Sequence, residues 1–258
     1  MKIIFTLFLF LFNLSSSGQG TFNYQKDFKE ILAKTKDSTG SLSYGKLLTR
    51  FIANDTTLTR YQTLALMIGF TDQPDYNPYD DLDTEKEIFV MNDEGNYEDA
   101  LQEANVYLAT HPVSLRVLKE KSYSLHQLKK SDSAEYYMDL VHKIMLAMLF
   151  SGNGKTIETP MFALGLADGE RFTENAGMAI SNKGTGESKS GLYLQLIDAV
   201  KDEGDHINLF FVIQHARNKI TGEVIIGDKT KKSSKKSRKK EKKEKETNMP
   251  IPETKENQ

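Results

Sequence analysis

Apolar residues recur at helical intervals along the first half of the chain. Within residues 24–32 they fall at positions i, i+4, i+7 and i+8, which place them on one side of an α-helix. Residues 47–52 and 58–68 repeat this spacing and predict two further helices, the second of which we expect to end at Gly69. The pattern therefore predicts that residues 19–150 form a mainly helical region.

Polar residues interrupt the helical pattern between residues 72 and 81. This segment contains two prolines and several acidic residues, and it predicts an ordered loop. Thr84 then predicts the N-cap of the next helix, because Glu85 and Glu87 would lie in its first turn, where the helix dipole favours negative charge.

Two similar turns follow at an interval of 34 residues. The first, Gly-Asn-Tyr-Glu-Asp-Ala-Leu, begins at Gly95 and contains Tyr97 and Ala100; the second places Ala134 at the matching position. Pro112 lies twelve residues after Ala100. This spacing resembles the tetratricopeptide repeat, in which glycine permits a tight turn, a small residue lets two helices approach, and proline ends the second helix. Because about three repeats are usually needed for stability, we expect other parts of the chain to cover the exposed helix faces.

After residue 150 the pattern changes to short apolar runs separated by glycine-bearing turns. These runs predict strands at residues 161–166, 178–181, 191–200 and 206–215, with a short helix at 168–176 and a last edge strand at 223–226. The expected fold is α+β: tetratricopeptide-like helix hairpins, followed in residues 151–227 by a small, mainly antiparallel sheet with a short helix, packed on the helices.

Three segments together resemble a known family. They are the loop Gly69-Phe70 … Gln73-Pro74-Asp75-Tyr76-Asn77-Pro78-Tyr79, the repeat-like helices, and Ser151-Gly152-Asn153-Gly154-Lys155-Thr156-Ile157-Glu158-Thr159-Pro160. In these segments the chain resembles domain of unknown function 4919, an uncharacterised family of secreted proteins from Bacteroidota-type bacteria. The resemblance spans residues 22–220. It implies an exported protein with this fold, and it brings no known activity.

The N-terminal residues are typical of a secretory signal peptide. Lys2 precedes residues 3–12, of which only Thr6 is polar, and small residues follow up to Gly18. The apolar run is about half as long as the roughly 20 residues that span a bilayer. We therefore expect residues 1–18 to be removed, with cleavage after Gly18 or Gly20, and the mature chain to have no transmembrane segment. This predicts a periplasmic, cell-surface or extracellular protein.

The charge is unevenly distributed. The chain has 34 basic and 36 acidic residues, but 12 basic and 5 acidic residues lie in residues 229–258, which leaves 22 basic and 31 acidic residues elsewhere. These counts give a tail of charge +7 and a body of charge −9. Residues 228–258 are predicted to be disordered, because the stretch from Lys229 to Lys245 has no apolar residue to bury. The tail is either a solubilising appendage or a docking segment for an anionic envelope polymer; it lacks the interleaved aromatic residues that favour specific nucleic-acid binding.

Catalytic and metal-binding motifs do not stand out. Residues 152–156, Gly-Asn-Gly-Lys-Thr, match only the end of a phosphate-binding loop, since Leu149 occupies a required glycine position. The acids at 80–87 do not fit a calcium-binding loop, because Lys86 stands where that loop requires glycine. The five histidines show no metal-ligand spacing, and cysteine is absent. We therefore assign no catalytic residue, metal ligand or cofactor, although a carboxylate pair from distant parts of the chain would leave no spacing signature.

The candidate binding residues are Asp75, Tyr76, Pro78 and Tyr79. Aromatic rings on a proline-stiffened loop offer contact area to a glycan or peptide, while the alternative is that the tyrosines pack the loop onto the helices. Our leading hypothesis is a non-enzymatic protein- or peptide-binding scaffold of the cell envelope, because stacked helix pairs form concave binding surfaces. The alternatives are an envelope hydrolase that acts on glycan or peptide through carboxylates, and a protein that docks on anionic surfaces through its basic tail.

Overall fold

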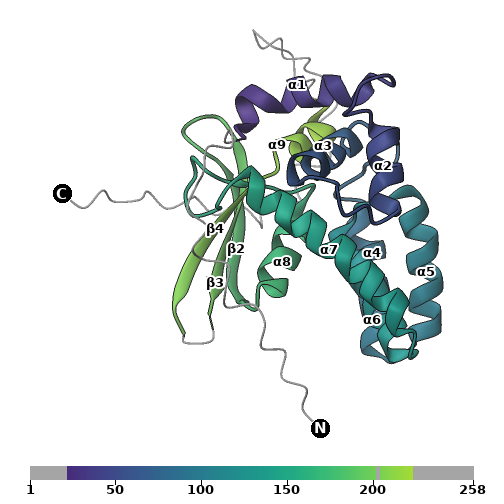
Figure 1. Ribbon diagram of the computed structural model, residues 1–258. Coiled ribbons are helices and arrows are strands. Elements are labelled where there is room, and N and C mark those ends of the chain that lie inside the picture. The colour runs from purple at the N-terminus through teal and green to yellow at the C-terminus, as the bar shows by residue number, and fades with distance from the viewer. Residues whose placement is uncertain (1–21, 202–203, 223–258) are drawn as a thin grey trace.

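The computed structural model describes residues 22–201 and 204–222, and it confirms the α+β class. Figure 1 shows the sheet on one side of the molecule and α4–α6 on the other, with α7 running from one to the other and α8 between them. The elements, in chain order, are α1 (Tyr24–Lys36), α2 (Tyr44–Ile52), α3 (Arg60–Phe70), α4 (Asp81–Asp93), α5 (Tyr97–Thr110), α6 (Leu115–Gln127), α7 (Ser131–Ser151), β1 (Met161–Phe162), α8 (Leu166–Asn175), β2 (Ala179–Glu187), β3 (Tyr193–Val200), β4 (His206–Val212) and α9 (Gln214–Thr221). The predicted signal peptide, the basic tail and the strand at 223–226 lie outside the described residues.

Helix α3 forms the centre of the N-terminal layer. All its residues from Thr63 to Phe70 are buried, because α1, α2 and α7 surround it. The prediction that this helix ends at Gly69 is wrong. Gly69 lies inside the helix, where a Cβ atom would be only 3.0 Å from the ring of Tyr44 and 3.1 Å from Thr35. The missing side chain lets the helices approach closely, which is a packing role rather than a stop signal.

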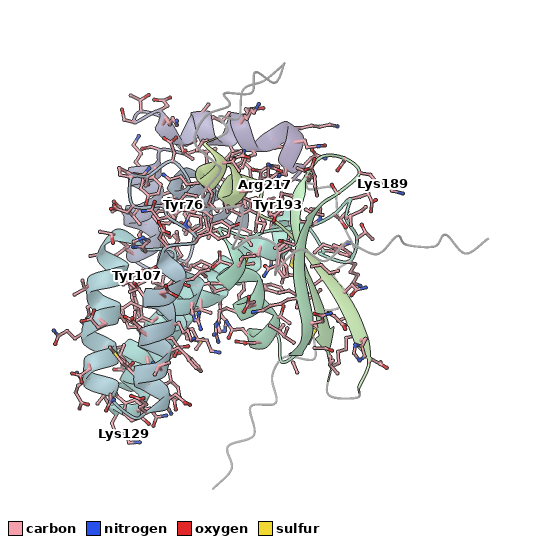
Figure 2. The ribbon with its side chains drawn as sticks, turned by 180° about the vertical axis from the view of Figure 1, so that it is seen from behind. Tyr76, Tyr107, Lys129, Lys189, Tyr193 and Arg217 are labelled. Carbon is pink, nitrogen blue, oxygen red and sulfur yellow. The ribbon has the colours of Figure 1, made fainter. Side chains whose placement is uncertain are left out.

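Two helix hairpins follow, α4 with α5 and α6 with α7. The structure starts α4 at Asp81, so the prediction of an N-cap at Thr84 is wrong; Asp80 takes that position. Ala100 and Ala134, near the starts of α5 and α7, are 0% and 6% exposed, as close helix approach requires. Gly95 (φ 83°) and Lys129 (φ 62°), also 34 residues apart, both take positive φ in the turns. Figure 2 places Lys129 at the far tip of the helical layer.

The other two residues assigned to the repeat turns also have defined environments. Tyr97 is the first residue of α5, and its ring meets the edge of Tyr123 on α6, with the ring centroids 6.0 Å apart. Pro112 is buried in the connection between α5 and α6. The two residues therefore lie where the first hairpin meets the second.

The four strands form one mixed sheet in the order β1-β4-β3-β2. Only β1 and β4 run parallel; the other two pairs are antiparallel. The strand predicted at 161–166 ends at Phe162. It stops there because the Asp168 side chain accepts a hydrogen bond from the Leu164 amide and α8 starts at Leu166. The strand predicted at 178–181 extends to Glu187, since its polar residues pair with β3 at the sheet edge.

Strand β4 ends three residues before the predicted limit at His215. Gln214 begins α9, and its side-chain oxygen accepts a hydrogen bond from the Tyr193 amide at 2.7 Å, at the end of β3. The Ile213 amide still donates to the Tyr193 backbone oxygen at 3.1 Å, so the Gln214 side chain replaces one of the two backbone bonds of the next pair. The short helix α9 then buries His215 and Ala216 against the core. The sequence pattern gave no sign of α9.

One hydrophobic core joins the helical region to the sheet, and it includes Leu64, Met148, Phe162 and Phe211. A smaller cluster holds the first hairpin together; its members are Ile88, Ala100, Ala104, Tyr107 and Val117. None of the helices in the described ranges combines the length and the apolar character that crossing a lipid bilayer requires.

Candidate functional site

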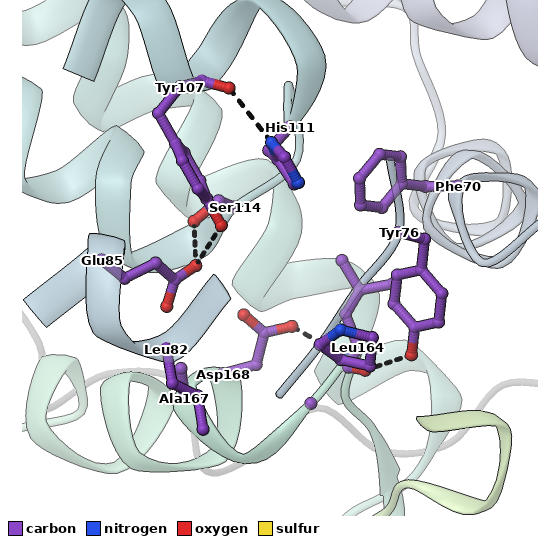
Figure 3. A pocket seen from close by; sticks show the side chains of 12 residues that line it. Phe70, Tyr76, Leu82, Glu85, Tyr107, His111, Ser114, Leu164, Ala167 and Asp168 are labelled. Carbon is purple, nitrogen blue, oxygen red and sulfur yellow. Dashed lines mark hydrogen bonds between the residues drawn. The ribbon is translucent and has the colours of Figure 1, made fainter. Parts of the chain in front are cut away.

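A polar cavity lies where α4, α6 and α8 meet the loop that precedes α4. Its volume is about 40 Å³, room for water, which occupies about 30 Å³ per molecule in the liquid. Its polar lining consists of Glu85, Tyr107, His111, Ser114 and Asp168, and Figure 3 shows the carboxylates of Glu85 and Asp168 pointing toward the same space. Two acids thus share one small, buried site.

Glu85 is held by hydroxyl groups from two other helices. Its Oε1 atom accepts hydrogen bonds from Ser114 Oγ at 2.7 Å and from the Tyr107 hydroxyl at 3.2 Å. Ser114 is also the N-cap of α6, where its Oγ accepts a hydrogen bond from the Val117 amide. The carboxylate therefore lies at the positive end of the α6 dipole, which favours its charge although the residue is only 7% exposed.

Asp168 is the second acid of the cavity. It lies in the first turn of α8, is 5% exposed, and accepts a hydrogen bond from the Leu164 amide at 2.9 Å. Burial, and then the nearby charge of Glu85, raise the pKa of Asp168 to about 7. The amide hydrogen bond opposes this rise without cancelling it. Asp168 can therefore gain or lose a proton near neutral pH.

His111 connects the loop to α5. Its ring stacks on Tyr107 with centroids 4.2 Å apart, and its Nε2 lies 2.8 Å from the backbone oxygen of Asp75. The Nδ1 atom lies 2.8 Å from the Thr110 hydroxyl. If Nε2 carries the proton, it donates to Asp75 while Nδ1 accepts from Thr110. Nε2 thus holds the loop, while Nδ1 fixes the ring to the end of α5.

The sequence-predicted binding residues line this loop, but they do not form one exposed surface. Tyr76 is 2% exposed and its hydroxyl donates to the Leu164 backbone oxygen at 2.6 Å, so its predicted role as a surface aromatic is wrong. Pro78 lines the cavity, and Tyr79 is half-buried against the core. Of the four candidate residues, Asp75 alone is exposed. For Tyr76 the packing alternative is correct, because its hydroxyl finds a buried acceptor.

The acid pair was not found from the sequence. Glu85 and Asp168 are 83 residues apart, and each looked like an ordinary first-turn acid. Only the packing of α8 between the sheet and α6 brings them together. Close packing of α8 on the sheet depends on Gly169, where a Cβ atom would lie 2.3 Å from Gln195 Oε1. In the sequence, the only sign of this close packing is a glycine, Gly169, inside a predicted helix.

The phosphate-loop-like segment has its own internal hydrogen bonds. The Gly154 amide donates to the Thr159 backbone oxygen at 2.8 Å, and the Lys155 amide donates to Asn153 Oδ1 at 2.9 Å. A phosphate-binding loop requires backbone amides that point at the ligand. These two amides donate within the segment instead. Within residues 22–201 and 204–222, no group of three or more histidine, aspartate or glutamate side chains could hold a metal ion.

A comparison with protein families gives a match over most of the folded region. The model of the family described as Domain of unknown function (DUF4919) matches residues 29–222. The chain belongs to this family. Searches of curated proteins and of solved structures gave no significant match. The DUF4919 assignment carries no activity, so function must be argued from the residues.

The DUF4919 chain has a second feature of interest on the outer side of α4. Asp83, Lys86, Glu87, Val90 and Met91 fall at i, i+3, i+4, i+7 and i+8, and they line a depression of about 420 Å³. Among the described residues, four of the seven large apolar side chains that are exposed belong to α4–α6; they are Phe89, Val90, Val106 and Tyr123. Of these four, Val90 lines the depression.

Proposed function

We propose that this protein is a non-enzymatic scaffold of the cell envelope that binds a protein or peptide on the outer side of α4. The observation that carries this proposal is the depression lined by Asp83, Lys86, Glu87, Val90 and Met91, which we call the α4 surface. Export from the cytoplasm is part of the proposal, and its support is the N-terminal sequence.

The composition of the α4 surface suits a protein partner. Val90 is 38% exposed and Met91 is half-buried, so the depression has an apolar strip. Asp83, Lys86 and Glu87 add charges of both signs beside it. An apolar centre with a polar rim is the usual arrangement of a protein interface. Behind the strip, Ile88 is 1% exposed and packs in the smaller cluster, which fixes the helix in place.

The cavity is a weaker basis for function. A volume of about 40 Å³ leaves room for water but not for a sugar ring or a peptide. Glu85 on α4 also bonds to Tyr107 on α5 and to Ser114 at the start of α6. These contacts support a role in holding the helices together.

A paired substitution tests the proposed surface. Val90→Glu places a charge in the α4 surface, while Ile52→Glu places the same charge at a 51% exposed apolar residue on α2. We expect a partner retained from solubilised envelope by the wild type to be retained equally by Ile52→Glu and at least tenfold less by Val90→Glu. The measurement is quantitative mass spectrometry of the retained proteins. Circular dichroism should show that both variants fold.

Three results would contradict the proposal. The first is equal retention of the same partners by all three proteins, which would place binding elsewhere. The second is no protein retained by the wild type above the level of an unrelated exported protein. The third is a bound partner whose retention falls equally in both variants.

One observation favours a second function, hydrolysis by the acid pair. Glu85 and Asp168 form a carboxylate pair in which one pKa is raised to about 7, as general acid catalysis at neutral pH requires. Turnover of envelope polysaccharides or peptides that is lost in both Glu85→Gln and Asp168→Asn would support it. No turnover by the wild type across such a panel would remove it. Docking through Lys229–Lys245 stays a prediction, since those residues lie outside the described structure.

A further inference from the structure

Two arginines from different helices meet at one aromatic ring on the inner side of α4. The guanidinium carbon of Arg171, on α8, lies 5.3 Å from the centre of the Phe89 ring, and that of Arg116, on α6, lies 5.8 Å from it. Both distances are within the range of a cation–π contact. Three elements that are distant in sequence therefore bring two positive charges to one place.

The acids around these arginines already have partners of their own. Glu120 accepts a hydrogen bond from Asn92 Nδ2 at 3.0 Å, and Glu170 pairs with Lys183 at 2.7 Å. Glu85 accepts from Ser114 and Tyr107. These groups lower the local positive potential, but none of the three carboxylates accepts a hydrogen bond from Arg116. The glutamates thus offset the charge of the arginines without accepting hydrogen bonds from Arg116.

Arg116 has donors but no acceptor. Within residues 22–201 and 204–222 its guanidinium makes neither a hydrogen bond nor an ion pair, and its Nε atom is buried without a partner. Arg171 bonds through Nη1 to Glu174 at 2.5 Å, but its own Nε is also buried without a partner. A buried charged donor without an acceptor is unfavourable, so each of these Nε–H groups calls for an acceptor such as water or an anion.

We propose that Arg116 and Arg171 form a binding site for the oxyanion group of a small molecule, a phosphate or a carboxylate, beside Phe89. The planar fork of each guanidinium presents two N–H groups in the geometry that these anions accept. An anion between the arginines also relieves their mutual repulsion. Partial burial and the charge of Arg171 lower the pKa of Arg116, although it stays protonated, so both arginines keep their charge when the site is empty. The proposal is independent of the α4 surface, which lies on the other side of the helix.

The alternative is that the arginines serve only as packing against Phe89. A cation–π contact stabilises only weakly where the ring is exposed, and Phe89 is 37% exposed. Packing against Phe89 does not explain why the buried Nε–H groups of Arg116 and Arg171 lack acceptors. The two explanations differ in one measurable way, because only a binding site responds to a specific anion at constant ionic strength.

The test is a titration of the full chain followed by ¹⁵N–¹H spectra of the arginine Nε–H groups. Inorganic phosphate and sodium acetate are added in separate arms, with sodium chloride reduced to keep the ionic strength constant. We expect the Arg116 and Arg171 resonances to shift saturably with at least one anion. Saturation by phosphate alone or acetate alone identifies the oxyanion. Linear shifts of all arginines in both arms, or no shift of these two, would overturn the proposal.

Variants make the assignment specific. Arg116→Gln should weaken anion binding at least tenfold, measured from the remaining Arg171 resonance. The matched control is Arg217→Gln, since Arg217 also stacks on an aromatic ring, 4.5 Å from the centre of Tyr193, and pairs with Glu187 at 3.3 Å (Figure 2). Binding should be unchanged in this control. Equal binding by the wild type and Arg116→Gln, with both folded by circular dichroism, would contradict the site.

Discussion

The two sides of α4 differ in how their side chains are used. On the inner side, Glu85, Ile88 and Asn92 are buried, and the Asn92 amide bonds to Glu120 while its oxygen accepts from Ser124 Oγ at 2.7 Å. On the outer side, Val90 is exposed and lines the α4 surface. One helix thus separates residues that build the fold from residues that we propose bind a partner. The comparison predicts that equal substitutions on the two sides have unequal effects.

Shortening an apolar side chain should give the largest difference. Ile88→Ala removes atoms from a 1% exposed position and should lower the free energy of unfolding by about 3 kcal/mol, since a cavity remains. Val90→Ala should change it by less than about 0.5 kcal/mol. Urea unfolding followed by circular dichroism measures both values. Similar losses for the two variants would show that the outer side is also part of the core.

Removing a buried amide should have the next largest effect. Asn92→Ala leaves the Glu120 carboxylate without its amide donor and Ser124 Oγ with only the Glu120 backbone oxygen as acceptor, and we expect a loss of about 2 kcal/mol. Glu87→Ala, on the outer side, should cost less than about 0.5 kcal/mol. The same urea measurement compares them. A negligible loss in Asn92→Ala would mean that water replaces the amide and that the inner side is more open than the structure shows.

The acid cavity should make stability depend on pH in a defined direction. Because the folded pKa of Asp168 is raised from 3.8 to about 7, its contribution is complete below about pH 4 and is lost as the pH rises through 7. Asp168→Asn removes this dependence and keeps an acceptor for the Leu164 amide. The stability of the variant relative to the wild type should therefore increase by about 1–3 kcal/mol between pH 4 and pH 8. A constant difference would show that the acid is ionised throughout this range.

The smallest effect on stability should come from reversing a charge on the outer side. Glu87→Lys should change the free energy of unfolding by less than about 0.5 kcal/mol, because Glu87 is exposed. We nevertheless expect it to weaken partner binding, since a charge at the rim mainly sets specificity. Binding of the partner identified with the wild type provides the measurement. Unchanged binding would restrict the interface to the apolar strip.

Local signals in the sequence predicted the fold well. The apolar spacing of residues 24–32 and the small residues Ala100 and Ala134 depend on nearby positions. The structure buries Phe28, Ile31 and both alanines, and it half-buries Tyr24 and Leu32. The helix start at Asp81 was missed because Thr84 offered a better local cap than the one the tertiary structure uses. Local preference is a weak guide where packing decides.

The candidate sites could not be predicted in the same way. Arg116 and Arg171 are 55 residues apart, and no spacing rule links them. Tyr76 appeared suited to a surface because its loop is polar, yet its hydroxyl finds the Leu164 carbonyl 88 residues later. Such contacts depend on how α8 and the sheet dock on the helices, which one sequence does not reveal.

The most direct test of the central claim is photocrosslinking in living cells from the α4 surface and from a control position on α2. A photoreactive phenylalanine analogue replaces Val90 in the full chain, and Ile52 carries it in the control. We predict a discrete protein adduct from position 90 and none from position 52. The same adduct from both positions, or none from position 90, would contradict the assignment of the α4 surface as the binding site.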